Sequence, residues 1–424
     1  QRRRHQNDGR FMHASSLARE PAAVPSELAR RAPRDWLARA LRASRADTLA
    51  TFAAYQRALP DLIVPRREEF NPPLWELGHI GWFQGYQVTR NPARAQGHRA
   101  DPEAPRRPPR RPDADALYDS SRVLHAARWN LPLPDVSCTR SELERQLDEL
   151  LGLVDTLPAT ADDDALYFFR LALLHEDMHH EAALYMAQGL GVPIDDARWQ
   201  PAPLPQPAAP LRFAPGEWSL GSASGGYAFD NELPAHRVAL PAFEIDAQVL
   251  RWAEYLPFVE AGGYRESRWW TEAGWAWRGA QGAQAPRYLE RAPDGGWRRQ
   301  RYGRWEPLVA EQAASHLSLH EALAWCRWAG RRLPTEAEWE RAAVEAGPAF
   351  SWGEVWEWTA SPFAPYPGFV AHPYRDYSAP WFDGRPVLRG ASFMTQPRLR
   401  HSRYRNYFQA HRHDLAAGLR TVAA

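Results

Sequence analysis

Two histidines with a metal-binding spacing lie in a long segment of helical character. His175 and His179 fall within residues 164–190, which contain no proline and no glycine before Gly189. On a helix, residues four apart lie on one face, one turn from each other, so both imidazoles can bind the same metal ion. The alternative is an ordinary helix with one buried and one solvated histidine. The spacing alone leaves both interpretations open.

A third histidine, His79, lies in the apolar segment NPPLWELGHIGWFQGYQVTR at residues 71–90. Asn71 is a candidate N-cap, and prolines fit the first turn of a helix, so a helix is expected here. The neighbours of His79 are mostly apolar, which predicts an inward-facing imidazole. It is either a neutral buried side chain with one hydrogen-bond partner or a third metal ligand on a helix packed against the histidine pair.

Two more amphipathic helices are expected next to these segments, at residues 35–59, with Asp35 as N-cap, and at residues 141–157. Helical character also returns at residues 113–129. Residues 92–113 are rich in arginine and proline and should form no stable element. Four helices with inward-facing ligands predict a bundle, and bundle cores host metal sites built from facing helices.

The chain divides at a proline-rich linker, residues 198–212. We expect a mobile tail at residues 1–33, the helical bundle at 34–197 and an irregular α+β domain at 213–424. The elements expected in this second domain are strands at residues 213–220, 238–245 and 387–393, and helices at residues 318–328 and 335–344. Thr335 and Glu338 predict a capping box at the start of the last helix.

The overall composition excludes several classes of function. The chain has 424 residues and a net charge of +1, from 52 basic and 51 acidic residues, so nothing attracts it to nucleic acid or to a membrane. No apolar run reaches the length of a membrane span, and no secretory signal is expected. The two cysteines, Cys138 and Cys326, fall in different predicted domains. They can form neither a disulfide framework nor a cysteine metal site, which favours a cytoplasmic protein.

Several motifs resemble a known family. FDNELPAHRV (229–238), GRRLPTEAEWERAA (330–343), VWEWTASPF (355–363) and VLRGASF (387–393) are similar to the formylglycine-generating-enzyme fold, which is C-type-lectin-like. The first half resembles a DinB-like four-helix bundle, so the expected fold class is α + (α+β). This domain order resembles the non-haem iron sulfoxide synthases of ergothioneine biosynthesis and their selenoneine-synthase relatives. WELGHIGWFQ (75–84) and the H-x-x-x-H-x-E of His175, His179 and Glu181 are the most specific matches.

The resemblance implies an oxidoreductase in which His79, His175 and His179 hold Fe(II), with O2 as co-substrate and hercynine as substrate. It implies that Glu181 orients a ligand. We expect the active site between the two domains, at the open end of the bundle, because the bundle supplies a metal but few polar groups and the second domain supplies Trp, Arg and Tyr on long loops. The resemblance also implies a tyrosine proton donor, for which the candidates are Tyr404, Tyr407 and Tyr118. The candidates for contact with the substrate are Trp82, Phe83, Arg128, Met178, Trp356, Phe393, Arg405 and Asn406. Each aromatic candidate has packing in the core as its alternative role.

Two features bear on the chalcogen donor. Met178 stands where thiol-using members often have glutamine, and residues 112–134 replace a recognisable arginine pair. Both favour the selenoneine-synthase branch, which uses a selenosugar. The arginines at 106, 107, 110 and 111 leave open a clamp for γ-glutamylcysteine, and a thiol-using sulfoxide synthase is the alternative.

Two further interpretations come from other classes of protein. A formylglycine-generating or other cofactor-free oxidase is disfavoured, because the copper site of the former needs a cysteine pair. The third interpretation is a lectin-like binding module fused to a metal-stabilised bundle, without catalysis. Oxygen consumption in the presence of hercynine distinguishes this module from an enzyme.

Overall fold

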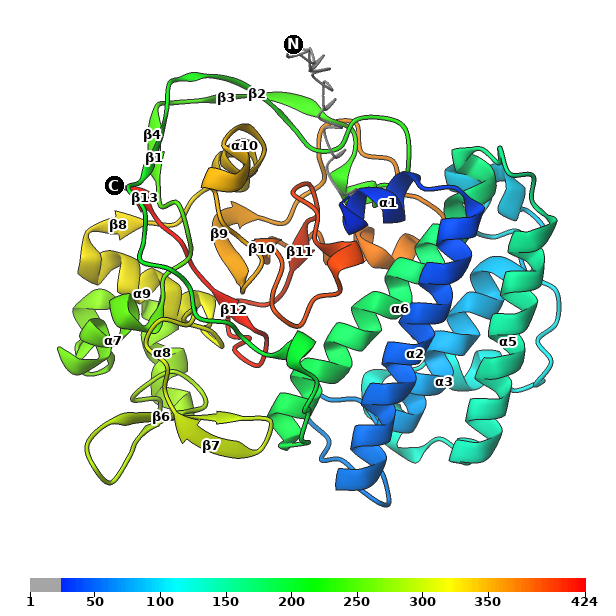
Figure 1. Ribbon diagram of the computed structural model, residues 1–424, viewed down its shortest axis with the longest axis horizontal. Helices are drawn as coiled ribbons and strands as arrows, with labels where there is room; N and C mark the ends of the chain where they lie inside the picture. Colours follow the sequence, from blue (N-terminus) through cyan, green and yellow to red (C-terminus); the bar gives the residue numbers. More distant parts are fainter. Residues whose placement is uncertain (1–23) are drawn as a thin grey trace, which may run out of the picture.

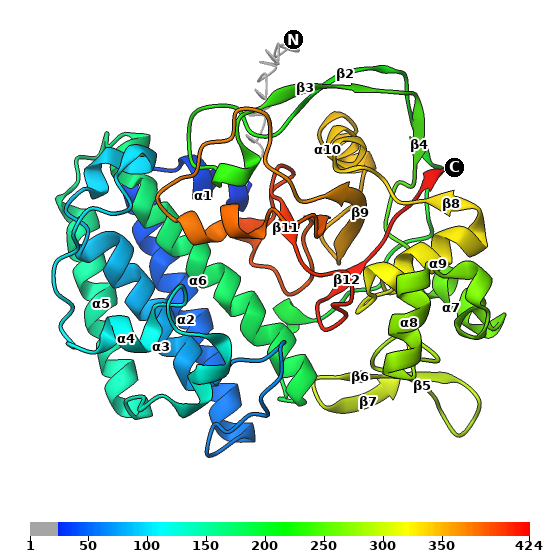
Figure 2. The ribbon, with the colours of Figure 1, turned by 180° about the vertical axis from the view of Figure 1, so that it is seen from behind.

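The computed structural model describes residues 24–424. A helical unit and a mixed unit of helices and short strands lie next to each other, as Figures 1 and 2 show from opposite sides. The helices are α1 (Pro25–Arg31), α2 (Arg34–Ala58), α3 (Pro73–Gln84), α4 (Ala114–Tyr118), α5 (Val136–Thr156), α6 (Asp163–Leu190), α7 (Trp252–Glu260), α8 (Glu272–Gln281), α9 (Leu319–Ala329) and α10 (Glu336–Glu345).

The strands are short and lie in the second half of the chain. They are β1 (Leu211–Phe213), β2 (Gly216–Leu220), β3 (His236–Leu240), β4 (Phe243–Ile245), β5 (Leu289–Arg291), β6 (Trp297–Arg301), β7 (Arg304–Pro307), β8 (Arg331–Arg332), β9 (Trp356–Pro362), β10 (Pro386–Gly390), β11 (Asn406–Tyr407), β12 (Ala417–Gly418) and β13 (Val422–Ala423).

Four long helices, α2, α3, α5 and α6, pack against one another and form the helical unit. The sequence anticipated all four. Helix α6 begins because the side chain of Asp162 accepts a hydrogen bond from the backbone N–H of Ala165. It ends at Gly191, whose φ of 71° lies in the left-handed region that glycine adopts without strain. The 28 residues between these caps hold His175 and His179 on one regular helix.

The two predicted N-caps at the other helices are wrong. Helix α2 begins after Pro33, so Asp35 lies in its first turn. Helix α3 begins after Pro72, and Asn71 instead donates from its side chain to Glu76. Helix α3 also ends earlier than expected and continues as a π-helix, Gly85–Thr89.

Three segments of the first half differ from the expectation. The loop at residues 92–113 contains a 3-10 helix, Arg94–Arg99. The segment 113–129 contains only the short helix α4 and a 3-10 turn, His125–Asn130. Part of the predicted mobile tail is ordered, because α1 buries Arg30 in an ion pair of 2.8 Å with Glu232 of the mixed unit. Residues 1–23 lie outside the described part of the chain.

The mixed unit contains two four-stranded sheets, in the orders β1-β4-β13-β8 and β11-β10-β9-β12. The predicted strands at residues 213–220 and 238–245 each divide into two, because two residues outside any strand separate β1 from β2 and β3 from β4. The capping box of α10 is confirmed: Thr335 accepts from the backbone of Glu338, and Glu338 accepts from the backbone of Thr335.

The connection between β9 and β10, residues 363–385, is a long loop that reaches the helical unit. His372 hydrogen-bonds Tyr167 of α6 at 3.1 Å, and Tyr374 packs its edge against Phe83 of α3. A second contact joins the two units where Arg398 donates two hydrogen bonds to Asp177 of α6, at 2.8 and 2.7 Å. Helix α6 therefore forms one side of the joint between the units.

Candidate metal centre and substrate cavity

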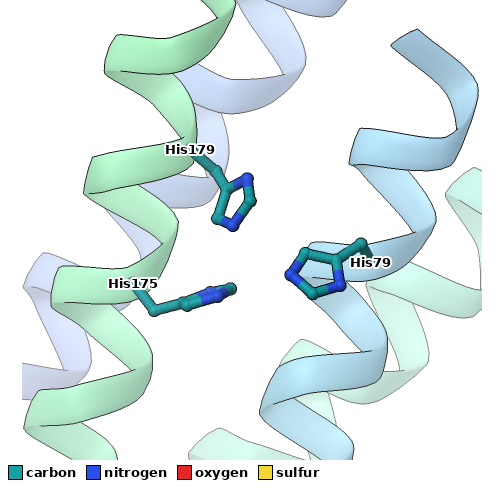
Figure 3. A group of neighbouring side chains, drawn as sticks. All are labelled: His79, His175 and His179. Carbon is teal, nitrogen blue, oxygen red and sulfur yellow. The ribbon is translucent and has the colours of Figure 1, made fainter. Parts of the chain in front are cut away.

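The structure brings together the three histidines that the sequence singled out. His79 extends from α3, and His175 and His179 extend from successive turns of α6 toward the same space, as Figure 3 shows. One ring nitrogen from each lies within 4.8 Å of those of the other two. His79 and His175 are buried and His179 is half-buried. Three imidazoles around one point are a donor set that suits iron, zinc or copper.

Hydrogen bonds fix the orientation of two of these rings. Nδ1 of His79 donates to the backbone carbonyl of Tyr118 at 2.8 Å, and Nδ1 of His179 donates to the carboxylate of Glu76 at 2.6 Å. Because a carbonyl and a carboxylate only accept, the proton stays on Nδ1 of each ring. The lone pair of each Nε2 is therefore left for a metal ion, as in other carboxylate–histidine–metal arrangements.

The third ring, His175, provides the test of whether a metal fits. Neither of its nitrogens has a hydrogen-bond partner among residues 24–424, although both are buried. Its ring stacks on Phe83 with the ring centres 3.5 Å apart and the planes within 2°. A buried polar atom without a partner is unfavourable, and a metal ion at the common point would give one of the two nitrogens a partner. The site fits a metal for this reason.

Burial favours the neutral form of two of these imidazoles, His79 and His175, and the neutral form is the one that binds metals. Burial lowers the pKa of His79 to about 3, with a contribution from neighbouring His179. Burial, assisted by the other two histidines, also lowers the pKa of His175 well below its usual value. For Glu76, burial raises the pKa, but the interactions with His179 outweigh it and bring the pKa to about 2. Glu76 is thus an ionised acceptor for His179.

A cavity of about 360 Å³ adjoins His175 and His179, between α6 and the mixed unit. This is the place that the sequence predicted for the active site. Its walls carry many aromatic side chains and two arginines. The lining residues that bear on function are Met178, Glu181, Trp356, Tyr374, Tyr377, Trp381, Arg385, Tyr404, Asn406, Tyr407, Phe408 and Arg412.

Tyrosine hydroxyls form a connected group in this cavity. The hydroxyls of Tyr377 and Tyr404 are 2.8 Å apart, and the Tyr404 hydroxyl lies 3.4 Å from the sulfur of Met178, the residue before the candidate ligand His179. The hydroxyl of Tyr407 donates to the backbone carbonyl of Tyr377. Burial raises the pKa of both Tyr377 and Tyr404, so both carry their protons at neutral pH.

Several predicted residues line the cavity, and one of them acts differently from the prediction. The residues in place are Met178, Trp356, Asn406, Tyr404 and Tyr407. Glu181 also lines the cavity, but it orients no metal ligand. It accepts hydrogen bonds from Trp356, Ser392 and Thr395 of the mixed unit, at 2.7, 2.9 and 2.8 Å. Glu76 on α3 has the orienting role instead.

Other predicted contacts lie elsewhere. The ring of Tyr118 packs against Gly78 and lines a separate hollow, so its part in the site is its carbonyl and not its hydroxyl. Phe393 packs in a hydrophobic cluster with Tyr302. The buried guanidinium of Arg405 binds the carboxylate of Glu336 at 2.9 and 3.0 Å. None of these three residues lines the cavity next to His175 and His179.

Three of the predicted aromatic or basic substrate contacts instead pack on the candidate metal-binding histidines or on a neighbour of these histidines. Phe83 stacks on His175, as described above. Trp82 packs against His79 with ring centres 5.7 Å apart and donates its indole N–H to Asp115 at 2.7 Å. Arg128 lies over Trp75. None of the three is among the residues that line the cavity.

Sequence reasoning missed Glu76, Tyr374 and Tyr377. Glu76 had a usable signal, because it precedes His79 by three positions and so lies on the same helix face. Tyr374 and Tyr377 had none, since they belong to a long loop without periodicity. Tyr374 lies edge-on to His175 with ring centres 5.9 Å apart.

The fold and the site define a two-unit protein with a candidate three-histidine centre facing an aromatic cavity. The model of the FGE-sulfatase family, described as a sulfatase-modifying factor enzyme 1-like domain, matches residues 198–354. Hercynine oxygenase of Mycolicibacterium smegmatis is 32% identical, over 82% of this chain and 90% of its own length. Hercynine oxygenase of Mycobacterium tuberculosis is also 32% identical, with the same two coverages. Formylglycine-generating enzyme of Streptomyces coelicolor is 33% identical over 39% of this chain and 58% of its own length.

The chain therefore belongs to the hercynine oxygenase family and is an oxidoreductase-type enzyme. This overturns the interpretation as a binding module without catalysis. The cysteine-pair chemistry of a formylglycine-generating oxidase has no place here, because Cys138 is exposed on α5 while Cys326 is buried on α9. None of the helices within residues 24–424 is long and apolar enough to cross a membrane.

Proposed function

We propose that this enzyme forms a carbon–chalcogen bond at C2 of the imidazole of hercynine, with Fe(II) at the three histidines and O2 as co-substrate. The observation that carries the proposal is the pair of fixed Nε2 lone pairs and the unpartnered His175 next to an aromatic cavity. In the reaction the C2–H and chalcogen–H bonds break and the carbon–chalcogen bond forms, while O2 is reduced: one oxygen atom is bonded to the chalcogen and the other leaves as water with the two hydrogens. When bound, Fe(II) supplies the oxygen-activating chemistry.

The cavity suits a ligand like hercynine, which combines a quaternary ammonium group with a carboxylate. The aromatic rings of Tyr374, Tyr377 and Trp381 line the cavity, and aromatic rings attract a cation that has no hydrogen-bond donors. The side-chain NH₂ of Asn406 offers a donor for a carboxylate. The hydroxyl pair of Tyr377 and Tyr404 lies where it can hold and deliver a proton.

For the donor we propose a selenosugar, which makes the enzyme a selenoneine synthase. The two arginines of the cavity are already compensated: Asp383 accepts two hydrogen bonds from Arg385, and Asp414 accepts two from Arg412. A γ-glutamyl dipeptide brings two carboxylates, and burying them without free cations is unfavourable. A selenosugar carries its negative charge on selenium, next to the metal.

Two arguments from the sequence favour selenium, namely Met178 in place of a glutamine and the segment 112–134 in place of an arginine pair. The position of Met178 supports the first argument, and the position of the segment does not support the second. Met178 lines the cavity beside Tyr404, so it is placed to affect the donor. The segment 112–134 does not line this cavity. The arginines at 107, 110 and 111 line a hollow on the other side of α3, so they form no clamp in the cavity.

The test is anaerobic loading with Fe(II) and hercynine, followed by oxygen and each donor in turn, read by mass spectrometry. The selenosugar is expected to give the C2–selenium product faster than γ-glutamylcysteine or cysteine gives a sulfoxide. Faster reaction with either thiol makes the enzyme a sulfoxide synthase of ergothioneine biosynthesis. No product with any donor overturns the proposed function. In a second arm, Met178→Gln should shift the preference toward the thiols, because an amide hydrogen-bonds polar donor groups that a thioether does not.

A further inference from the structure

Arg128 lies outside the cavity but is fixed beside the start of α3, the helix that carries His79. It belongs to the 3-10 turn His125–Asn130. On either side of it, the ring of His125 donates to the carbonyl of Phe70 at 2.8 Å, and the indole of Trp129 donates to the carbonyl of Val64 at 2.9 Å. The turn is thus bound to the chain that leads into α3, and the guanidinium is held in one place.

A chain of hydrogen bonds connects Arg128 with one metal-binding histidine. Its Nη1 donates to Oδ1 of Asn71 at 2.8 Å, and Nδ2 of Asn71 donates to Oε1 of Glu76 at 2.6 Å. The other oxygen of Glu76 accepts from Nδ1 of His179 at 2.6 Å. A carboxamide matches both neighbours, because its oxygen faces the cation and its NH₂ faces the carboxylate. The relay therefore fixes both oxygens of Glu76.

A stack of rings connects the same arginine with a second histidine. The guanidinium carbon lies 3.9 Å from the ring centre of Trp75. Trp75 stacks on His79 with ring centres 4.9 Å apart and planes within 11°. The indole of Trp75 donates to the carbonyl of Leu117, one residue before the Tyr118 carbonyl that accepts from His79. Trp75 therefore lies between Arg128 and the His79 ring and is in contact with both.

We propose that Arg128 is a positioning residue of the metal centre, acting on His179 through Asn71 and Glu76 and on His79 through Trp75. The inference rests on the proposed role of the three histidines as metal ligands. Its physical basis is geometric: a carboxylate and a ring that are held by one fixed guanidinium keep two ligands aimed at the metal, so less ordering is needed when the ion binds.

The experiment measures Co(II) binding to the metal-free full-length protein, by affinity and by the visible ligand-field spectrum, without substrate. Arg128→Met removes both routes and should weaken binding about 10-fold, with a shifted spectrum. Asn71→Leu removes only the relay and should weaken it less. Arg128→Lys keeps the charge but not the planar fork, so it should fall between Arg128→Met and the wild type. Arg122→Met is the matched control, because Arg122 is exposed on the same segment and pairs with Asp119.

The effects of Arg128→Met and Asn71→Leu should not add in the double variant, since both break the same relay. Wild-type affinity and spectrum in Arg128→Met overturn the inference. If Arg128→Met does not fold, as judged by the thermal unfolding of the metal-free protein, Arg128→Lys and Asn71→Leu decide in the same way. Failure of the wild type itself to bind Co(II) counts instead against the proposed metal function, so the two failures are distinguishable.

Discussion

The two sides of the cavity are built by different means. On the helical side, α3 and α6 place three histidines at fixed helical positions, and carbonyl and carboxylate groups orient two of them. On the other side, the mixed unit supplies tyrosines and arginines from the loop 363–385 and from the segment around β11. The comparison suggests a division of labour: the helices determine whether a metal binds, and the loops determine which substrates react.

The sharpest way to test this division is to remove one helical ligand. His175→Ala should lose the metal and reduce turnover to background, because the two remaining imidazoles leave the ion mostly hydrated. Metal analysis after dialysis measures this. The control is His180→Gln, since His180 is the next histidine along α6 but hydrogen-bonds Thr51 at 3.0 Å. Full metal occupancy in His175→Ala would remove this residue from the centre.

For residues on the loop side, the comparison predicts that a substitution lowers turnover but leaves metal affinity unchanged. Tyr404→Phe removes the hydroxyl next to Tyr377 and Met178 and should reduce turnover about 100-fold, the order of a lost proton donor. Metal affinity should stay at the wild-type value. Tyr366→Phe is the control, because its hydroxyl binds Glu336 and does not line the cavity. A fall in metal affinity in Tyr404→Phe would break the division.

The next prediction concerns the stability of the contact between the two sides of the cavity. Trp356→Phe leaves the buried Glu181 with one donor fewer and should destabilise the fold by about 1–3 kcal/mol. Urea unfolding of the metal-free protein measures the loss. Trp381→Phe serves as a comparison, because the Trp381 indole donates to the backbone carbonyl of Asp376 on an exposed loop. Equal stability of the two variants would show that Glu181 does not depend on this contact.

The smallest predicted effect concerns a buried histidine of the mixed unit. Burial, with help from Arg287, lowers the pKa of His316 to about 3 in the folded state. In the unfolded chain the imidazole of His316 takes up a proton near pH 6.5, whereas in the folded state it stays neutral. Below pH 6.5 the unfolded state therefore binds more protons, and the free energy of unfolding falls. Asparagine tolerates the φ of 60° observed at this position, so the test variant is His316→Asn. Between pH 7.5 and 5.5 its free energy of unfolding should fall by about 1 kcal/mol less than that of the wild type. Identical losses in thermal or urea unfolding would contradict this.

The parts of the fold that repeat with a helical period could be read from the sequence. The four long helices and the capping box at Thr335 were predictable, because apolar spacing and cap residues act locally. That α1 is an ordered helix and not part of a mobile tail could not be predicted, since it depends on the ion pair between Arg30 and Glu232, which are 202 residues apart. The same limit applies to the site: spacing indicates His175 and His179, whereas Tyr374 comes from a loop whose position only the assembled fold determines.

The hydrogen bonds of Glu181 have a consequence for how the protein unfolds. The three donors come from the mixed unit, and the acceptor lies on α6. Separating the units would break these three hydrogen bonds and expose the apolar surface that both units bury together, so an intermediate with one unit intact is unfavourable. The metal-bearing helices and the cavity wall should therefore melt as one cooperative block in calorimetry, with a single peak for both halves.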